Sequence, residues 1–101
     1  MMRDQVIRIL RAHKQEIRAA GVLSVSLFGS VARGEKPVHD VDVAVRLGEG
    51  FSQRGLDYFS RLDDLEHRLS ELLGYKVDVV EEPVRKQRFQ QEIDRDRSLA
   101  F

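Results

Sequence analysis

Two aspartates and a Gly-Ser pair are the residues of this chain whose types and spacing could do chemistry. Asp40 and Asp42 alternate with valines, so on a strand both carboxylates lie on one face, about 7 Å apart along the chain. Two such carboxylates repel each other, and Mg²⁺ relieves the repulsion because carboxylate oxygens are its preferred ligands. Upstream, Gly29 lets the backbone approach a ligand closely, and the Ser30 hydroxyl can donate to phosphate oxygens. The four residues together indicate metal-assisted chemistry on a phosphate.

Two predicted strands must position these groups. Residues 22–28 alternate apolar and polar residues and end directly before the Gly-Ser pair, and residues 40–47 carry the two aspartates opposite a valine face. The valine face is expected to pack into a core. The apolar face of the first strand is expected to hold Leu23, Val25 and Leu27. Residues 30–34 are predicted to form a short helical turn, whose first N–H groups favour phosphate.

A third predicted strand, residues 75–81, carries Asp78 between valines. A charge in the middle of a strand has two explanations. The strand is at an edge with Asp78 on its exposed face, or sheet pairing brings Asp78 beside Asp40 and Asp42 as a third carboxylate. The strand pattern alone leaves both open.

Helices are predicted where apolar residues recur at helical spacing, over residues 4–20, 56–73 and 84–97. The first two helices are followed by Gly21 and Gly74, which favour helix ends. The glycine-rich segment from Gly48 to Gly55 is predicted to be a flexible loop. The apolar residues 98–101 are expected to pack on the domain or join an interface.

The composition limits the classes of function. A chain of 101 residues is expected to form a single domain over residues 1–101. Lys plus Arg and Asp plus Glu both total 17, and this neutral balance argues against a surface that binds nucleic acid directly. There are no cysteines and no apolar run of about 20 residues that could span a membrane. A cytoplasmic location without membrane contact is the expectation.

Gly29-Ser30, nine intervening residues and Asp40-Val41-Asp42 resemble the motif of the nucleotidyltransferase superfamily that includes DNA polymerase beta. The match is closest to the minimal nucleotidyltransferases, stand-alone proteins of about this length, many of which are antitoxins paired with HEPN-domain toxins. Members often carry Ser where this chain has His39, and their spacer is commonly one residue longer. The resemblance implies an α+β fold, with a small mixed sheet and helices packed mainly on one face.

The resemblance also implies a reaction and a site. The expected reaction is Mg²⁺-dependent transfer of a nucleoside monophosphate, AMP from ATP in the first instance, onto a hydroxyl of a partner protein. Asp40 and Asp42 would bridge two Mg²⁺ ions, and Asp78 would be the third catalytic and metal-binding carboxylate. The expected nucleotide-binding residues are Gly29, Ser30 and Arg33. Arg33 lies in the family's Ala-Arg-Gly pattern, and the alternative for it is a solvated surface charge.

The resemblance implies a HEPN-type toxin as the partner. A domain of this size has no part left over to form a base-reading or RNA-binding domain, which favours an acceptor brought in by a partner protein. Two alternatives stay open on the sequence. The chain is a non-catalytic antitoxin that neutralises its partner by binding, or it is a subunit of an aminoglycoside-type nucleotidyltransferase that modifies a small molecule. A homo-oligomer and a hetero-oligomer are both compatible with the sequence.

Overall fold

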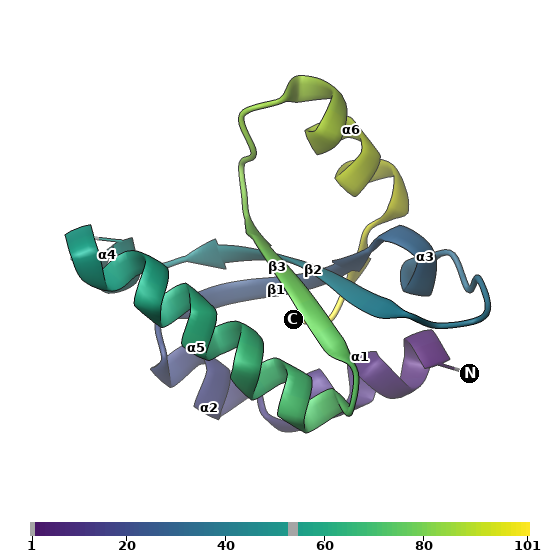
Figure 1. The fold of residues 1–101 in the computed structure, drawn as a ribbon, viewed down its shortest axis with the longest axis horizontal. Coiled ribbons are helices and arrows are strands. Elements are labelled where there is room, and N and C mark those ends of the chain that lie inside the picture. The colour runs from purple at the N-terminus through teal and green to yellow at the C-terminus, as the bar shows by residue number, and fades with distance from the viewer. Residues whose placement is uncertain (1, 53–54) are drawn as a thin grey trace.

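A computed structural model describes residues 2–52 and 55–101, and its centre is a four-stranded sheet in the order β3-β2-β1-β4 (Figure 1). The strands are β1 (Val22–Phe28), β2 (Asp40–Leu47), β3 (Lys76–Glu81) and β4 (Ser98–Leu99). β1 pairs antiparallel with β2 and β4, whereas β2 and β3 are parallel. The predicted α+β fold with a small mixed sheet is confirmed.

The helices lie mainly on one face of that sheet. They are α1 (Met2–Ala12), α2 (Lys14–Ala19), α3 (Gly29–Ala32), α4 (Glu49–Ser52), α5 (Gly55–Leu73) and α6 (Gln87–Asp96). Figure 1 shows α1, α2 and α5 on one side of the sheet and α6 on the other. Among the described residues, none of the helices is both long enough and apolar enough to cross a membrane.

The main core lies between the sheet and α1, α2 and α5. Val41, Val43 and Val45 point into it from β2, and each is fully buried. They meet Leu10 of α1 and Leu69 of α5, which are also fully buried. Burying a side chain of this kind contributes about 1.5–3 kcal/mol, which fixes the valine face of β2 inward. The alternation of the strand then places the carboxylates on the opposite face, as predicted.

A second, smaller cluster attaches α6 to the opposite face. Ile93 of α6 is fully buried against Phe28 of β1 and Ala44 of β2, and Phe89 packs at its margin. The rings of Phe28 and Phe89 meet edge to face, with centroids 5.8 Å apart. Therefore α6 covers part of the face from which the carboxylates emerge.

Three predicted elements differ in the structure. The first helix is interrupted at His13, whose φ of −105° and ψ of 16° separate α1 from α2. The predicted loop over residues 48–55 contains the short helix α4, because Phe51 is buried and anchors it; residues 53–54 lie outside the described residues. The last helix begins at Gln87 rather than Val84, since Lys86 directly before it has an extended backbone, with φ −77° and ψ 114°.

The first strand also differs in detail. A register shift between Val22 and Ser24 makes Leu23 the extra residue of a β-bulge. Val22 takes the buried position, and Leu23 is 58% exposed rather than facing the core as predicted.

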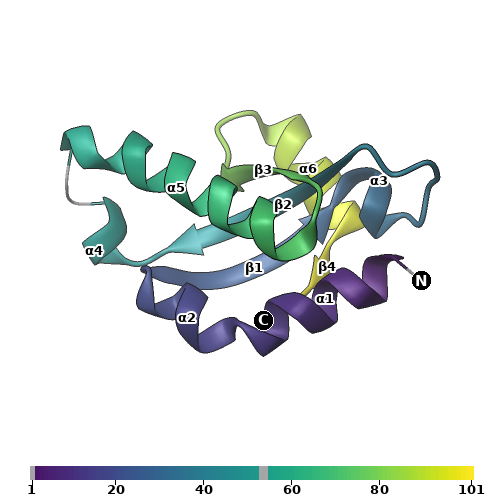
Figure 2. The same cartoon turned by 60° about the horizontal axis from the view of Figure 1, so that its bottom comes forward.

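The C-terminal residues pack on the domain. β4 runs alongside β1, above α1 in the view of Figure 2. Ala100 is buried, and the Arg11 side chain of α1 donates to its carbonyl oxygen at 2.7 Å.

Candidate active site

The register of the sheet brings the three predicted carboxylates to one face. Asp42 of β2 lies directly opposite Asp78 of the parallel strand β3, and Asp40 lies opposite Lys76. The structure combines the two explanations for Asp78: β3 is an edge strand, and sheet pairing places Asp78 beside Asp42. A metal-binding role for Asp78 stays a prediction. Asp78 is also half-exposed, with 44% of its side chain open to solvent, because β3 is an edge strand.

The environment of Asp42 disfavours its negative charge. Burial raises the pKa of the Asp42 carboxyl, and the neighbouring charges of Asp78 and Asp40 raise it further. The Arg33 guanidinium opposes the shift without cancelling it. The Lys76 amino group is 3.9 Å from Asp78, but this pair is largely solvent-exposed and contributes little. The site therefore has an excess of negative charge that a cation would neutralise.

Gly29 is required where it stands, directly after β1 and against Asp42. Phe28 is the β1 residue opposite Asp42, so the next residue along the chain passes beside that carboxylate. Gly29 has φ +74°, and a Cβ on it would lie 3.3 Å from Asp42 Cγ and overlap Oδ2. Only glycine combines this backbone conformation with this close approach.

Ser30 is the second residue of α3, the one-turn helix that begins at Gly29. The first N–H groups of a helix have no carbonyl partner within it. The helical turn thus begins beside Asp42, and its first N–H groups, with the Ser30 hydroxyl in the same turn, are the donors expected for a phosphate.

Arg33 is held between two acidic side chains. Its Nε donates to Glu35 at 2.7 Å and its Nη1 donates to Asp96 of α6 at 2.6 Å. Its side chain is 40% exposed. In this structure Arg33 therefore links α3 to α6, and a nucleotide contact by Arg33 stays a prediction.

The donor set fits a hard divalent cation, since it consists of carboxylates from adjacent strand positions with one raised pKa. Within residues 2–52 and 55–101, no group of three acidic, histidine or cysteine side chains is already gathered closely enough to hold a metal ion. The carboxylates would therefore have to turn toward a shared ion when it binds.

A buried charged network that the sequence pattern does not predict lies on the same face. The Glu82 side chain has no exposed surface. It accepts hydrogen bonds from Arg97 and, at 2.9 Å, from the Gln90 side chain. Arg97 also donates to the Ser26 hydroxyl oxygen at 2.9 Å. Burial alone would raise the pKa of Glu82, but the hydrogen bonds from Arg97 and Gln90 outweigh it and hold the pKa below its ordinary value. Ser26 and Arg97 are 71 residues apart in the chain, and no local sequence pattern signals their pairing.

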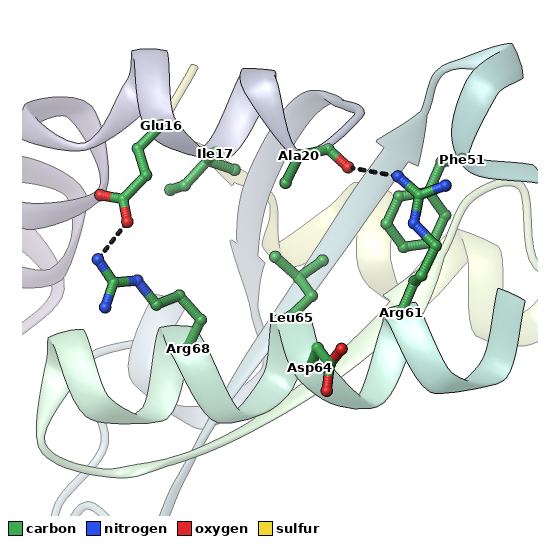
Figure 3. A pocket seen from close by; sticks show the side chains of 8 residues that line it. All are labelled: Glu16, Ile17, Ala20, Phe51, Arg61, Asp64, Leu65 and Arg68. Carbon is green, nitrogen blue, oxygen red and sulfur yellow. Dashed lines mark hydrogen bonds and ion pairs between the residues drawn. The ribbon is translucent and has the colours of Figure 1, made fainter. Parts of the chain in front are cut away.

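A separate cavity lies on the helical side of the sheet, between α2 and α5 (Figure 3). Its volume is about 280 Å³, and Ile17, Leu65 and Phe51 form its apolar wall. The Arg61 guanidinium stacks over the Phe51 ring at 4.8 Å, and Arg68 pairs with Glu16. None of the candidate site residues lines this cavity, so it is not part of the carboxylate site.

Comparison with known sequences gives one family and several relatives. The family described as nucleotidyltransferase domain matches residues 5–99. A candidate protein adenylyltransferase, MJ1217 of Methanocaldococcus jannaschii, is 37% identical over 79 residues, which cover 76% of this chain and 74% of the relative.

Solved structures share the fold. A candidate minimal nucleotidyltransferase superimposes with a TM-score of 0.66 at 30% identity, over 91% of this chain and 93% of the other. A toxin–antitoxin structure with AMP-PNP has a TM-score of 0.67 at 18% identity, over 100% of this chain and 73% of that one. A complex of a tri-AMPylated Shewanella oneidensis HEPN toxin with an MNT antitoxin has a TM-score of 0.60 at 18% identity, over 99% and 69%. At 18% identity these two likenesses concern the fold alone.

Proposed function

The chain belongs to the nucleotidyltransferase domain family, and we propose that its activity is the Mg²⁺-dependent transfer of AMP from ATP to a hydroxyl of a partner protein. Membership makes it a nucleotidyltransferase; the nucleotide, the metal and the acceptor are the proposal. ATP and adenylylation are supported by a relative named as a candidate protein adenylyltransferase and by the AMP-PNP in a structure of the same fold.

The observation that carries the proposal is the juxtaposition of Asp42 and Asp78 across β2 and β3, with Gly29 pressed against Asp42. Asp40, Asp42 and Asp78 would hold Mg²⁺, for which the mutual repulsion of the carboxylates is the physical reason. Two such ions, when bound, would stabilise the charge on the attacking and leaving oxygens.

The residues of the chain perform the remaining steps. Ser30 and the N–H groups at the start of α3 hold the phosphates of ATP, with its α-phosphorus facing the carboxylates. The acceptor oxygen forms a bond to the α-phosphorus, the bond between the α- and β-phosphates breaks, and pyrophosphate leaves. Asp78 accepts the proton of the acceptor hydroxyl, directly or through a water molecule, since 44% of its side chain is open to solvent.

We propose a HEPN-type toxin as the acceptor, which makes this chain its antitoxin in the cytoplasm, where ATP is available. The support is the fold shared with a chain of the complex between a tri-AMPylated HEPN toxin and an MNT antitoxin. Covalent addition of AMP to the toxin would then be the means of neutralisation.

The test uses purified protein, α-labelled ATP, Mg²⁺ and a lysate of the source organism, with wild type and Asp42→Asn side by side. Loss of this proposed ligand is expected to lower labelling of the acceptor protein by more than about a hundredfold, beyond the loss seen for groups that only support a metal ligand. The matched control is Asp63→Asn, since Asp63 is an exposed aspartate of α5, remote from the site.

Three results would contradict the proposal. Equal labelling by wild type and Asp42→Asn would refute the carboxylate assignment. Label in small molecules alone would point to the aminoglycoside-type reaction. An unlabelled lysate, with an Asp42→Asn variant that still neutralises a toxin, would point to an antitoxin that acts by binding.

A further inference from the structure

The open edge of β3 is occupied by two side chains of α5. The Val77 N–H donates to the Ser70 hydroxyl oxygen at 3.0 Å, and the Val79 N–H donates to Glu66 Oε2 at 2.8 Å. The Ser70 hydroxyl in turn donates to the Glu66 main-chain carbonyl at 2.7 Å. β3 is the terminal strand of the sheet, so these two N–H groups face away from β2.

These hydrogen bonds lie on either side of Asp78. The peptide unit that donates to Glu66 joins Asp78 to Val79, so the Glu66 carboxylate holds the unit that contains the Asp78 carbonyl group. The Val77 and Val79 side chains are buried in the core on the α5 side, 2% and 8% exposed. The β3 backbone is thus held by α5 and by the core, while the Asp78 side chain emerges on the opposite face beside Asp42.

The Glu66 carboxylate is a stronger hydrogen-bond acceptor for an N–H group of an edge strand than the water that normally occupies that place. A hydrogen bond to a carboxylate is about twice as strong as one between neutral groups. It also occupies the edge, which prevents another strand from pairing there. If Glu66 and Ser70 only protect the edge, covering the N–H groups is sufficient. If they also serve the site, removing the Glu66 hydrogen bond must change the position of the Asp78 carboxylate.

We propose that Glu66 is a positioning residue for Asp78, with Ser70 as its auxiliary. The inference rests on the proposed function, in which Asp78 holds a metal ion and accepts the proton of the acceptor. Without the Glu66 hydrogen bond, the peptide unit after Asp78 is held only through its pairing with β2, and the Asp78 carboxylate is positioned less exactly beside Asp42. Cation binding and transfer should then weaken together.

The test compares wild type, Glu66→Ala and Glu66→Gln by two measurements. One is the Mg²⁺ concentration that gives half-maximal labelling of the acceptor; the other is the rise in melting temperature that Mg²⁺ produces in the presence of AMP-PNP. Glu66→Ala is expected to lower the labelling rate about tenfold, as for other groups that orient metal ligands, and to require more Mg²⁺. Its Mg²⁺-induced rise in melting temperature should shrink. Glu66→Gln keeps an oxygen acceptor at the same place and should restore most of both.

Arg11→Ala is the matched control, because it removes a side-chain hydrogen bond to the backbone at the other end of the chain, that of Arg11 to the Ala100 carbonyl. It should lower stability and leave the Mg²⁺ requirement unchanged. Where Glu66→Ala fails to fold, Ser70→Ala and Glu66→Gln replace it, and Ser70→Ala is expected to raise the Mg²⁺ requirement.

Two results would overturn the inference. One is a Glu66→Ala variant with the wild-type Mg²⁺ requirement and melting response; the other is a Glu66→Gln variant as impaired as Glu66→Ala. If the wild type labels no acceptor, the proposed function fails. The Mg²⁺-induced melting response of the Glu66 variants still decides the positioning role.

Discussion

At the scale of single residues, the most constrained position of the site is Gly29. Its φ of +74° is one that residues with a Cβ rarely adopt, and the space for a Cβ is already taken by the Asp42 carboxylate. Gly34 offers a natural comparison. Its φ is +75°, but a Cβ there would meet nothing within 4 Å. The two glycines therefore separate the cost of the backbone conformation from the cost of crowding Asp42.

We expect Gly29→Ala to abolish most activity and Gly34→Ala to spare it. Both substitutions should cost about 1–2 kcal/mol of stability, the penalty for a Cβ in the left-handed region. Only Gly29→Ala also displaces Asp42, and a shift of about 1 Å in a reacting group can lower a rate about a hundredfold. Denaturant titration and the labelling rate of each variant would measure the two effects. Equal loss of labelling in both variants would contradict this account of Gly29.

At the scale of elements, α6 is joined to the sheet by charge as well as by apolar packing. Ile93 anchors it beside Ala44, and the Glu82–Arg97 pair joins the segment that precedes α6 to the residue that directly follows it. Arg33 adds a link from α3 through Asp96. Because the Glu82 side chain has no exposed surface, losing one partner would leave a buried charge, which is costly. The network thus holds α6 against the face that carries the carboxylates.

The charge of Glu82 should make stability depend on pH in a defined direction. The pKa of Glu82 is lower in the folded state than its ordinary value of 4.5, so ionised Glu82 stabilises the fold above that value. This contribution is lost as the pH falls through the lowered folded pKa. At pH 7 we expect Glu82→Gln to be about 2 kcal/mol less stable than wild type, the scale of a hydrogen bond to a charged group.

The measurement is denaturant unfolding of wild type and Glu82→Gln at several pH values between 7 and 3. The difference between them should shrink once the pH falls below about 4.5. Glu92→Gln, at an exposed position of α6, is the control and should show little difference at any of these values. A Glu82→Gln deficit that persists unchanged at low pH would refute the electrostatic explanation.

At the scale of the whole molecule, the two faces of the sheet have different roles. The face toward α1, α2 and α5 is apolar and supplies most of the buried core. The other face holds a small apolar cluster under α6 and the three carboxylates, and the raised pKa of Asp42 shows that its negative charge opposes folding there. Burial of apolar side chains on the first face therefore offsets the unfavourable charge of Asp42 on the second.

Ligand binding should consequently raise the stability of the domain, whereas the charge of Asp42 should lower it when no ligand is bound. Without ligand, Asp42→Asn should melt above wild type, because the raised pKa of Asp42 means that its charge disfavours the folded state at neutral pH. Mg²⁺ with AMP-PNP at about a hundred times its dissociation constant should stabilise wild type by about 2.7 kcal/mol. EDTA should remove the part that depends on the ion.

The check is a set of melting curves for wild type and Asp42→Asn, each with and without Mg²⁺ and AMP-PNP. The order of the two melting temperatures should reverse when both ligands are added. An Asp42→Asn variant stabilised as much as wild type would show that Asp42 does not bind the ion.

The part of the site that depends on local pattern could be predicted from the sequence. Alternating valines determined which face of β2 enters the core, and hence that Asp40 and Asp42 share the other face. The Gly-Ser pair directly after β1 indicated where the short helix begins. Burial of apolar side chains selects these arrangements segment by segment, so the spacing within each segment is sufficient.

Only the tertiary structure decided what depends on pairing between distant segments. It placed Asp78 opposite Asp42, which the strand pattern left open and the family resemblance favoured. It assigned Glu66 to an edge amide of β3 and made Leu23 the extra residue of a bulge. Each outcome depends on the register between elements, and a shift of one residue exchanges the two faces of a strand. Register is set by the packing of the whole domain, and no single segment of the sequence contains it.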